Sequence, residues 1–175
     1  MIVDPASDFL ILATPMGVPL LAEYDREGLK ALRFWKQGDH PPARTRDDAP
    51  RGDAVGRAVL LQLREYFAGE RRDFDLPLVA GGTAFQRRVW GALRRIPFGE
   101  TRSYKQLAAL VGSPAAVRAV GQANARNPIP IIVPCHRVLA ADGGLGGYLG
   151  YWEGDGHAPD LKRWLLEHER GNRGQ

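Results

Sequence analysis

The residues best suited to chemistry lie in one stretch, Asn127 to Val138, which holds Cys135, the only cysteine of the chain, with His136 beside it. A thiolate is a nucleophile, and an imidazole can accept the proton of a thiol. The apolar run from Ile129 to Val133 predicts a short buried strand, and Pro134 predicts a turn that holds the thiol at the lip of a core. A free cysteine is more often a small buried hydrophobic residue, however. The pair alone does not establish a nucleophile.

The positive charge of the chain is concentrated around this stretch. Residues 81–140 contain nine basic residues and one acid, a net charge of +8, whereas the whole chain carries +4. This segment indicates a polyanionic partner rather than a membrane surface, because no basic amphipathic face with exposed aromatic residues is evident. A merely solvated basic face is the alternative.

Length and composition are those of a globular protein. A chain of 175 residues, 44% of them hydrophobic and 25% charged, can form one large domain or two small ones. A single cysteine excludes an internal disulfide and a cysteine-cluster metal site, and it indicates a reducing compartment. Because no signal peptide is recognisable, we expect a cytoplasmic protein with no membrane anchor.

The elements that must position Cys135 follow from hydrophobic periodicity and turn residues, which predict an α+β fold in two domains, residues 1–78 and 79–175. The first is a small structural domain with a β-sheet and one helix. Its strands are predicted at Phe9–Ala13, Val18–Tyr24 and Leu29–Trp35. Residues 37–53 predict an irregular loop, and Ala54–Ala68 predicts the helix.

The second domain is predicted to be mainly helical and to contain a helix-turn-helix. Thr83 is placed to cap one helix, and Ser103 is placed to cap another over Tyr104–Val111. After a glycine break, Pro114 suits the first turn of a second helix, Ala115–Arg126. A further helix is predicted at Asp160–Arg170.

The second helix of the helix-turn-helix has an unusual composition. Such a helix commonly reads the major groove of DNA, but the alanines here offer no hydrogen-bond donors to base edges. Small side chains instead favour close approach to the narrow minor groove, with Arg118 as a solitary long cation. An alanine-rich helix that only packs against its neighbours is the alternative.

Two further features follow Cys135. The glycine-rich segment from Ala141 to Gly150 lacks the spacing of nucleotide-binding loops, and it predicts a flexible wall over a flat ligand, with Tyr148 as its aromatic surface. The last predicted helix carries Glu167 and Glu169 near its C-terminus, where acids are electrostatically unfavourable. Each is expected to be solvated unless it has a partner.

Four motifs together resemble the O6-alkylguanine-DNA alkyltransferases, a family of single-turnover DNA repair proteins. They are Pro134-Cys135-His136-Arg137-Val138 with Asn127 eight residues upstream, Arg-Ala-Val-Gly at 118–121, Gly-Glu-x-x-Ser-Tyr at 99–104, and Leu-Leu-x-His-Glu at 165–169. The likeness is close over residues 83–170 and general in the first half. It implies direct, irreversible transfer of an alkyl group from O6-alkylguanine, and from O4-alkylthymine, in DNA to Cys135, without a cofactor.

The resemblance also implies a role for each matching residue. Cys135 is the alkyl acceptor, His136 its base through a water, and Glu169 the residue that orients His136. Asn127 holds the turn, and Tyr104 stands at the DNA end of the pocket. The target atom cannot be reached inside a duplex, so the base is flipped out and Arg118 takes its place in the stack. The implied DNA contacts are Arg118, Tyr104, Lys105, Ser113, Ala119 and Arg126. The implied walls of the guanine pocket are Tyr148, Val138 and Leu149.

The chain departs from the family in two places. Some members hold zinc through N-terminal cysteines, which this chain lacks, so we expect no metal. Residues 151–157 look like an insertion, which we expect to be a surface loop rather than a cap on the pocket. We expect a monomer that binds duplex DNA through the minor groove, with cooperative binding left open. A non-catalytic lesion-binding module and a cysteine hydrolase are the alternative functions.

Overall fold

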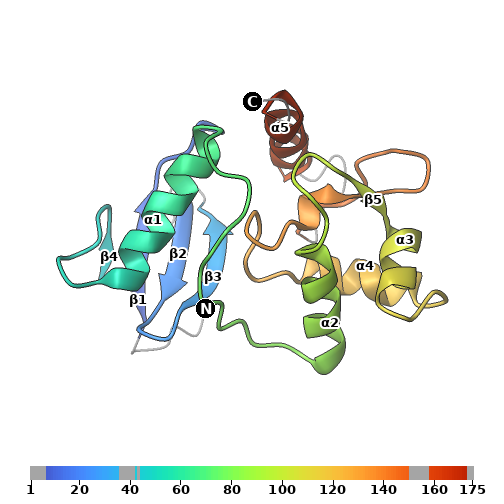
Figure 1. The fold of residues 1–175 in the computed structure, drawn as a ribbon, viewed down its shortest axis with the longest axis horizontal. Coiled ribbons are helices and arrows are strands. Elements are labelled where there is room, and N and C mark those ends of the chain that lie inside the picture. The colour runs from blue at the N-terminus through green and yellow to red at the C-terminus, as the bar shows by residue number, and fades with distance from the viewer. Residues whose placement is uncertain (1–6, 36–41, 43, 150–157, 173–175) are drawn as a thin grey trace. The chain divides into compact units, whose positions relative to one another are not determined.

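The structure is a computed structural model that describes residues 7–35, 42, 44–149 and 158–172. The chain divides into two compact units, Met1–Gly81 and Gly82–Gln175. The predicted α+β class is confirmed: the first unit holds a mixed sheet with a helix, and the second is mainly helical (Figure 1). No helix in the described ranges has the length and apolarity needed to cross a bilayer.

The first unit is a four-stranded sheet in the order β3-β2-β1-β4, packed against one helix. Its elements are β1 (Asp8–Leu12), β2 (Leu20–Tyr24), β3 (Leu29–Phe34), β4 (Thr45–Arg46) and α1 (Ala54–Phe67). Strands β1, β2 and β3 form an antiparallel meander, as the turn residues between them predict. The prediction of an entirely irregular loop over residues 37–53 was wrong, because Thr45 and Arg46 pair in parallel with β1. Hydrophobic periodicity cannot reveal so short an edge strand.

The second unit consists of three helices, a pair of very short strands, the turn that holds the cysteine, and a C-terminal helix (Figure 1). Its elements are α2 (Ala84–Leu93), β5 (Arg102–Ser103), α3 (Tyr104–Leu110), α4 (Val117–Ala125), the 3₁₀ turn η1 (Cys135–Arg137), β6 (Val138–Leu139) and α5 (Ala158–Gly171). Strands β5 and β6 pair in parallel, which fixes the start of α3 beside the residues that follow Cys135.

Local capping explains where two of these helices begin. The hydroxyl groups of Thr83 and Ser103 accept hydrogen bonds from the backbone N–H groups of Gln86 and Gln106, and both glutamines bond back to complete capping boxes. The prediction for the helix after Pro114 was wrong at its start. Helix α4 begins only at Val117, because a separate turn first joins the Ala116 N–H to the Ser113 carbonyl at 2.8 Å.

Candidate active site

The segment that leads into Cys135 is a turn, not the predicted strand. The side chain of Asn127 binds both of its ends: Nδ2 donates to the Val133 carbonyl at 2.7 Å, and Oδ1 accepts from the Ile129 N–H at 3.1 Å. A further backbone bond joins the Val133 N–H to the Ile129 carbonyl at 2.9 Å. The prolines in this segment provide no N–H donors for a strand ladder. The Asn127 side chain instead forms hydrogen bonds with backbone groups that could have paired with a neighbouring strand.

The same turn holds a β-branched residue in an unfavourable backbone conformation. Ile131 has a φ of 74°, in the left-handed region that such residues rarely adopt, and its side chain is buried in the core. Strained residues of this kind persist only where the surroundings dictate the conformation. The path of the chain into Cys135 is therefore fixed by its packing and by Asn127 rather than by local preference.

Cys135 lies inside the core, with 0% of its surface exposed, and not at the lip that the sequence predicts. Burial raises the pKa of the thiol to about 11, although the side chain of Asn127, the ammonium group of Lys162 and the side chain of Tyr148 each act to lower it. The resting group is therefore a neutral thiol. It needs a base to become a nucleophile at neutral pH.

The candidate base, His136, is the next residue along η1. His136 is fully buried, and its Nε2 lies 2.7 Å from Oε1 of Glu169. Burial lowers the pKa of His136 against the opposing effect of Glu169, so the ring is neutral. A carboxylate can only accept a hydrogen bond, so Nε2 carries the proton and Nδ1 keeps its lone pair. Nδ1 is buried and has no hydrogen-bond partner among the described residues, which leaves it able to accept a proton.

Glu169 is held as a carboxylate by several donors at once. Nε and Nη2 of Arg137 donate to its two oxygens at 2.8 and 2.9 Å, and the Gly99 N–H donates at 2.9 Å. Burial alone would raise the pKa of Glu169, but His136 and Arg137 hold it well below its usual range. Position near a helix C-terminus predicts a solvated acid, whereas the structure buries Glu169 and leaves Glu167 exposed.

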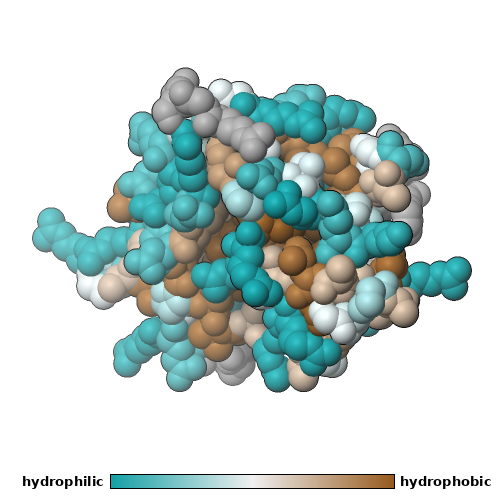
Figure 2. All heavy atoms as spheres, turned by 45° about the vertical axis from the view of Figure 1, so that its right-hand side comes forward, coloured by the Kyte–Doolittle hydropathy of each residue, from teal (hydrophilic) through white to brown (hydrophobic). Residues whose placement is uncertain are grey.

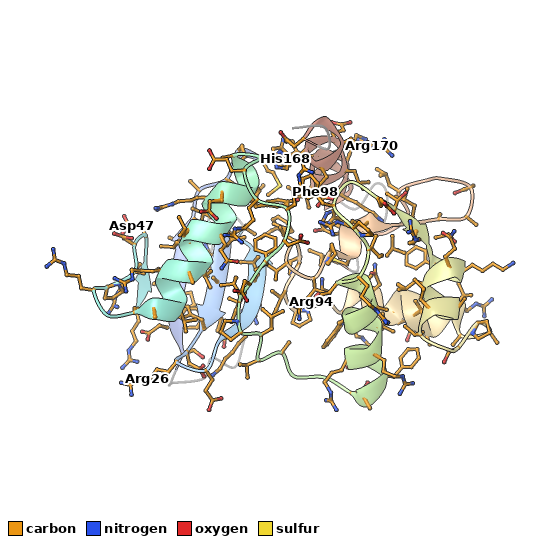
Figure 3. All side chains as sticks on the ribbon, in the orientation of Figure 1. Arg26, Asp47, Arg94, Phe98, His168 and Arg170 are labelled. Atoms are coloured by element: carbon orange, nitrogen blue, oxygen red, sulfur yellow. The ribbon has the colours of Figure 1, made fainter. Side chains whose placement is uncertain are left out.

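Arg137 is a site residue to which the sequence analysis assigned no role. Its guanidinium group is buried, pairs with Glu169, and donates through Nη1 to the Ile96 carbonyl at 2.6 Å. It also lies over the ring of Phe98, in the turn after α2 (Figure 3), with its Cζ 5.7 Å from the ring centroid. The only signal in the sequence is that Arg137 belongs to the cysteine motif.

Lys162 is a second such residue, and it has no exposed surface. Its Nζ donates to the carbonyls of Val138 at 2.7 Å and Gly147 at 3.3 Å, and also to the carbonyl of Leu145. These bonds join α5 and β6 to the glycine-rich segment. Burial lowers the pKa of Lys162 to about 8. Helical spacing gives the signal for this residue, because residues 161, 162, 165, 166 and 169 form one buried stripe of α5.

The aromatic residues predicted for the pocket come together around Cys135. Tyr148 is buried, and Tyr104 is half-buried at the first position of α3. The ring of Tyr104 lies about 4 Å from where side chains would begin at Gly121 and Gly146. Burial, and next the negative charge of Cys135 in its thiolate form, raise the pKa of Tyr104, while a hydrogen bond with the side chain of Asn124 lowers it.

Asn124 joins this group from α4. It is buried, and its Nδ2 lies 3.4 Å from the Cys135 carbonyl. Val138 is also buried, and its carbonyl accepts a hydrogen bond from Nζ of Lys162. Leu149 is half-buried with a φ of 50°, at the end of the described glycine-rich segment. The predicted insertion, residues 151–157, lies outside the described residues.

The residues predicted to contact DNA lie on and between helices α3 and α4, which pack against each other. Arg118, Ala119 and Arg126 are exposed along and just after α4, whose other side buries Val120 and Ala123. Lys105 is exposed on α3, and Ser113 is half-buried in the turn between the two helices. Tyr104 connects these helices to the cysteine, because its ring packs beside α4.

Comparisons with known proteins agree with these observations. The model described as "6-O-methylguanine DNA methyltransferase, DNA binding domain" matches residues 84–171, and the model for the ribonuclease-like domain of the same protein matches residues 10–80. A methylated-DNA–protein-cysteine methyltransferase of Methanosarcina acetivorans is 44% identical over 92% of this chain and 97% of its own length. A constitutive one of Bacillus subtilis is 58% identical over 62% of each chain.

Solved structures show the same likeness. The crystal structure of Mycobacterium tuberculosis OGT in complex with DNA is 42% identical, with a TM-score of 0.79 over 94% of both chains. The matches therefore cover both units and extend across most of the sequence. The chain belongs to the 6-O-methylguanine DNA methyltransferase family.

Proposed function

We propose that this protein repairs DNA by moving a methyl group from O6-methylguanine to Sγ of Cys135, once per molecule. The observation that carries the proposal is the buried series of a thiol, a neutral imidazole and an ionised carboxylate in Cys135, His136 and Glu169. It is the order of nucleophile, base and orienting acid that activates a hydroxyl or thiol in other settings. Relatives named as methylated-DNA–protein-cysteine methyltransferases support it.

The bonds and protons of the reaction balance without a further reactant. His136 Nδ1 takes the thiol proton, directly or through one water. The thiolate then attacks the methyl carbon, so that an S–C bond forms while the bond from carbon to O6 breaks. The leaving guanine carries the electron pair and takes up one proton to become ordinary guanine. We assign to the hydroxyl group of Tyr104 the role of donating a hydrogen bond toward the developing negative charge.

Irreversibility follows from the product. A thioether on Cys135 is not a substrate for displacement by water at neutral pH, so the acceptor is consumed. The same chemistry applies to larger O6-alkyl groups and to O4-alkylthymine, which we include in the proposed substrate class. The alkyl carbon in each case is attached to an enol-type oxygen whose departure restores a normal base.

Entry of the base requires its removal from the duplex, at a cost of a few kcal/mol. We assign α4 to the minor groove, because its exposed alanines allow close approach without reading sequence. Arg118 then fills the gap left in the stack. The bound form is a monomer on duplex DNA in this proposal, and the protein acts in the cytoplasm.

Counting transferred methyl groups tests the proposal against its alternatives. The protein is mixed with a tenfold excess of duplex containing one O6-methylguanine, and repaired duplex is measured until the reaction stops. One repaired duplex per protein supports the proposal, whereas none indicates a lesion-binding module and continued turnover indicates a hydrolase. Cys135→Ser is the control, and it should bind the duplex normally, since phosphate contacts dominate affinity, while repairing none of it.

A further inference from the structure

Helix α2 and the turn directly after it carry four exposed arginines. Arg87, Arg88, Arg94 and Arg95 are all exposed, and so is Gly91, which lies between the two pairs. At 3.6 residues per turn Arg87, Arg88, Gly91 and the C-cap residue Arg94, which is still in helical conformation, fall within about 120° of the helix circumference. Arg95 follows in the turn after the helix. Residues 84–95 contain no acid. The result is a cationic surface, the α2 arginine face, formed by Arg87, Arg88, Arg94 and Arg95.

This face points away from the helix assigned to the minor groove. The opposite side of α2 buries Val89, Trp90, Ala92 and Leu93. Trp90 donates from Nε1 to the Ala123 carbonyl of α4 at 2.9 Å, and Ala123 is itself buried. The arginines therefore project on the side of α2 that does not contact α4. A duplex held by Arg118 and its neighbours does not account for them.

The four side chains are available to a partner. Arg87 donates to the Gly82 carbonyl, and Arg88 lies over the ring of Phe85 with its Cζ 5.5 Å from the centroid. Neither contact neutralises a charge. Within the described residues, Arg94 and Arg95 form no ion pair, and Figure 3 shows Arg94 at the C-terminal end of α2. Long hydrophilic side chains also project from the surface of the protein in Figure 2.

The chemistry of the face matches a phosphate backbone. All four cations are arginines, whose planar groups bind phosphate oxygens in a bidentate manner. Arg87 and the C-cap residue Arg94 are separated by about 10.5 Å along the helix axis, at 1.5 Å per residue, so they can reach separate phosphates. The space beside Gly91, at the centre of the face, is open, because no neighbouring atom lies within 4 Å of where a side chain would begin. A phosphate backbone can therefore approach the centre of the face closely.

We propose that the α2 arginine face is a second, sequence-independent binding surface for the phosphate backbone of a nucleic acid, separate from the surface of α4. The protein then holds two DNA segments at once. This inference rests on the proposed binding of damaged DNA through α4. The second surface would keep the protein attached to one DNA segment while α4 contacts another.

A two-duplex capture experiment tests the inference. A short duplex with O6-methylguanine is fixed to beads and saturated with protein, and capture of a second, fluorescent duplex without damage is measured at increasing salt. The wild type should capture the second duplex. The variant with Arg87, Arg88, Arg94 and Arg95 all changed to Gln should lose capture roughly tenfold or more. Each arginine that contacts a phosphate contributes about 0.9 to the salt slope of that second binding step.

Matched controls separate this surface from general charge and from the proposed function. Arg57→Gln with Arg64→Gln removes two exposed arginines of α1, at the seven-residue spacing of Arg87 and Arg94, and should leave capture unchanged. The quadruple variant should bind the first duplex and transfer its methyl group at the normal rate. The inference is overturned if the wild type captures no second duplex, or if the α1 variant loses capture equally. It is also overturned if the quadruple variant loses methyl transfer to the same extent as capture. Failure to bind the first duplex would count instead against the proposed function.

Discussion

Glu169 is the residue on which the arrangement around Cys135 converges, because it binds His136, Arg137 and the Gly99 N–H together. Glu169→Gln should slow methyl transfer by well over tenfold, since an amide cannot serve as an anionic acceptor for both neighbours. It should also lower the free energy of unfolding by about 3–5 kcal/mol, because Arg137 would remain as a buried charge without its partner. Single-turnover kinetics and denaturant titration measure the two effects.

Glu167 provides the matched control, because it lies on the same helix and is exposed. Glu167→Gln should change neither the transfer rate nor the stability. If Glu167→Gln were the damaging substitution, the assignment of Glu169 as the orienting residue would be wrong.

The buried imidazole predicts how stability depends on pH. Burial lowers the pKa of His136 from its ordinary value of about 6.5. The unfolded chain therefore binds a proton at His136 that the folded chain does not, and acid favours unfolding. The free energy of unfolding should fall as the pH drops below about 6.5, and His136→Gln should make this fall shallower between pH 6.5 and 5. Denaturant titrations at several pH values test this, and an equal slope in both proteins would contradict it.

At the scale of elements, hydrogen bonds from Lys162 connect the glycine-rich segment to α5 and β6. Lys162→Met keeps much of the apolar stem but leaves the carbonyls of Val138, Leu145 and Gly147 without their shared donor. Amide exchange in residues 140–149 should therefore become faster, and methyl transfer should slow for duplex and free-base substrates alike. Arg163→Met is the control, because Arg163 is the exposed neighbour on α5. Unchanged exchange in Lys162→Met would show that other contacts hold the segment.

The elements also show what could be predicted from the sequence. The caps at Thr83 and Ser103 were predicted because each depends on residues within one turn of helix. The segment from Ile129 to Val133 is predicted as a strand because its apolar residues outweigh Pro130 in the hydrophobic pattern. Its actual shape is set by the side chain of Asn127.

The features that could not be predicted from the sequence depend on contacts between residues far apart in the chain. Strand β4 exists only through its pairing with β1. The burial of Arg137 and Lys162 depends on carbonyls and a carboxylate far away in the sequence. Arginine and lysine side chains are usually exposed, so residue type alone predicts that Arg137 and Lys162 lie on the surface. The roles proposed for Cys135, His136 and Glu169 are implied by the resemblance, since adjacency of a cysteine and a histidine does not predict a shared buried site.

At the scale of the molecule, charge separates the two units. Residues 1–81 contain 11 basic and 13 acidic residues, a net charge of −2, and residues 82–175 contain 13 basic and 7 acidic residues, a net charge of +6. Attraction to DNA therefore belongs to the second unit, which also holds Cys135. This agrees with the match of the DNA-binding domain model to residues 84–171.

Arg118 distinguishes insertion into the base stack from ordinary phosphate binding. Arg118→Ala should slow repair of O6-methylguanine in duplex DNA, while a free O6-substituted guanine should react at nearly the normal rate, because only the duplex requires an extrahelical base. Arg126→Ala removes the exposed arginine at the other end of α4. It should instead weaken binding to all duplexes alike and reduce the salt slope by about 0.9. Equal losses on both substrates for Arg118→Ala would mean that Arg118 supports the pocket.

Following the methyl group itself is the most direct test of transfer to Cys135. The protein is incubated with duplex carrying O6-methylguanine labelled with heavy carbon in the methyl group, and the products are examined by tandem mass spectrometry of peptides and by analysis of the released small molecules. We predict one labelled methyl group per protein, located on Cys135, and an equal amount of restored guanine in the duplex. A labelled methyl group on any other residue, or labelled methanol in solution, would contradict it.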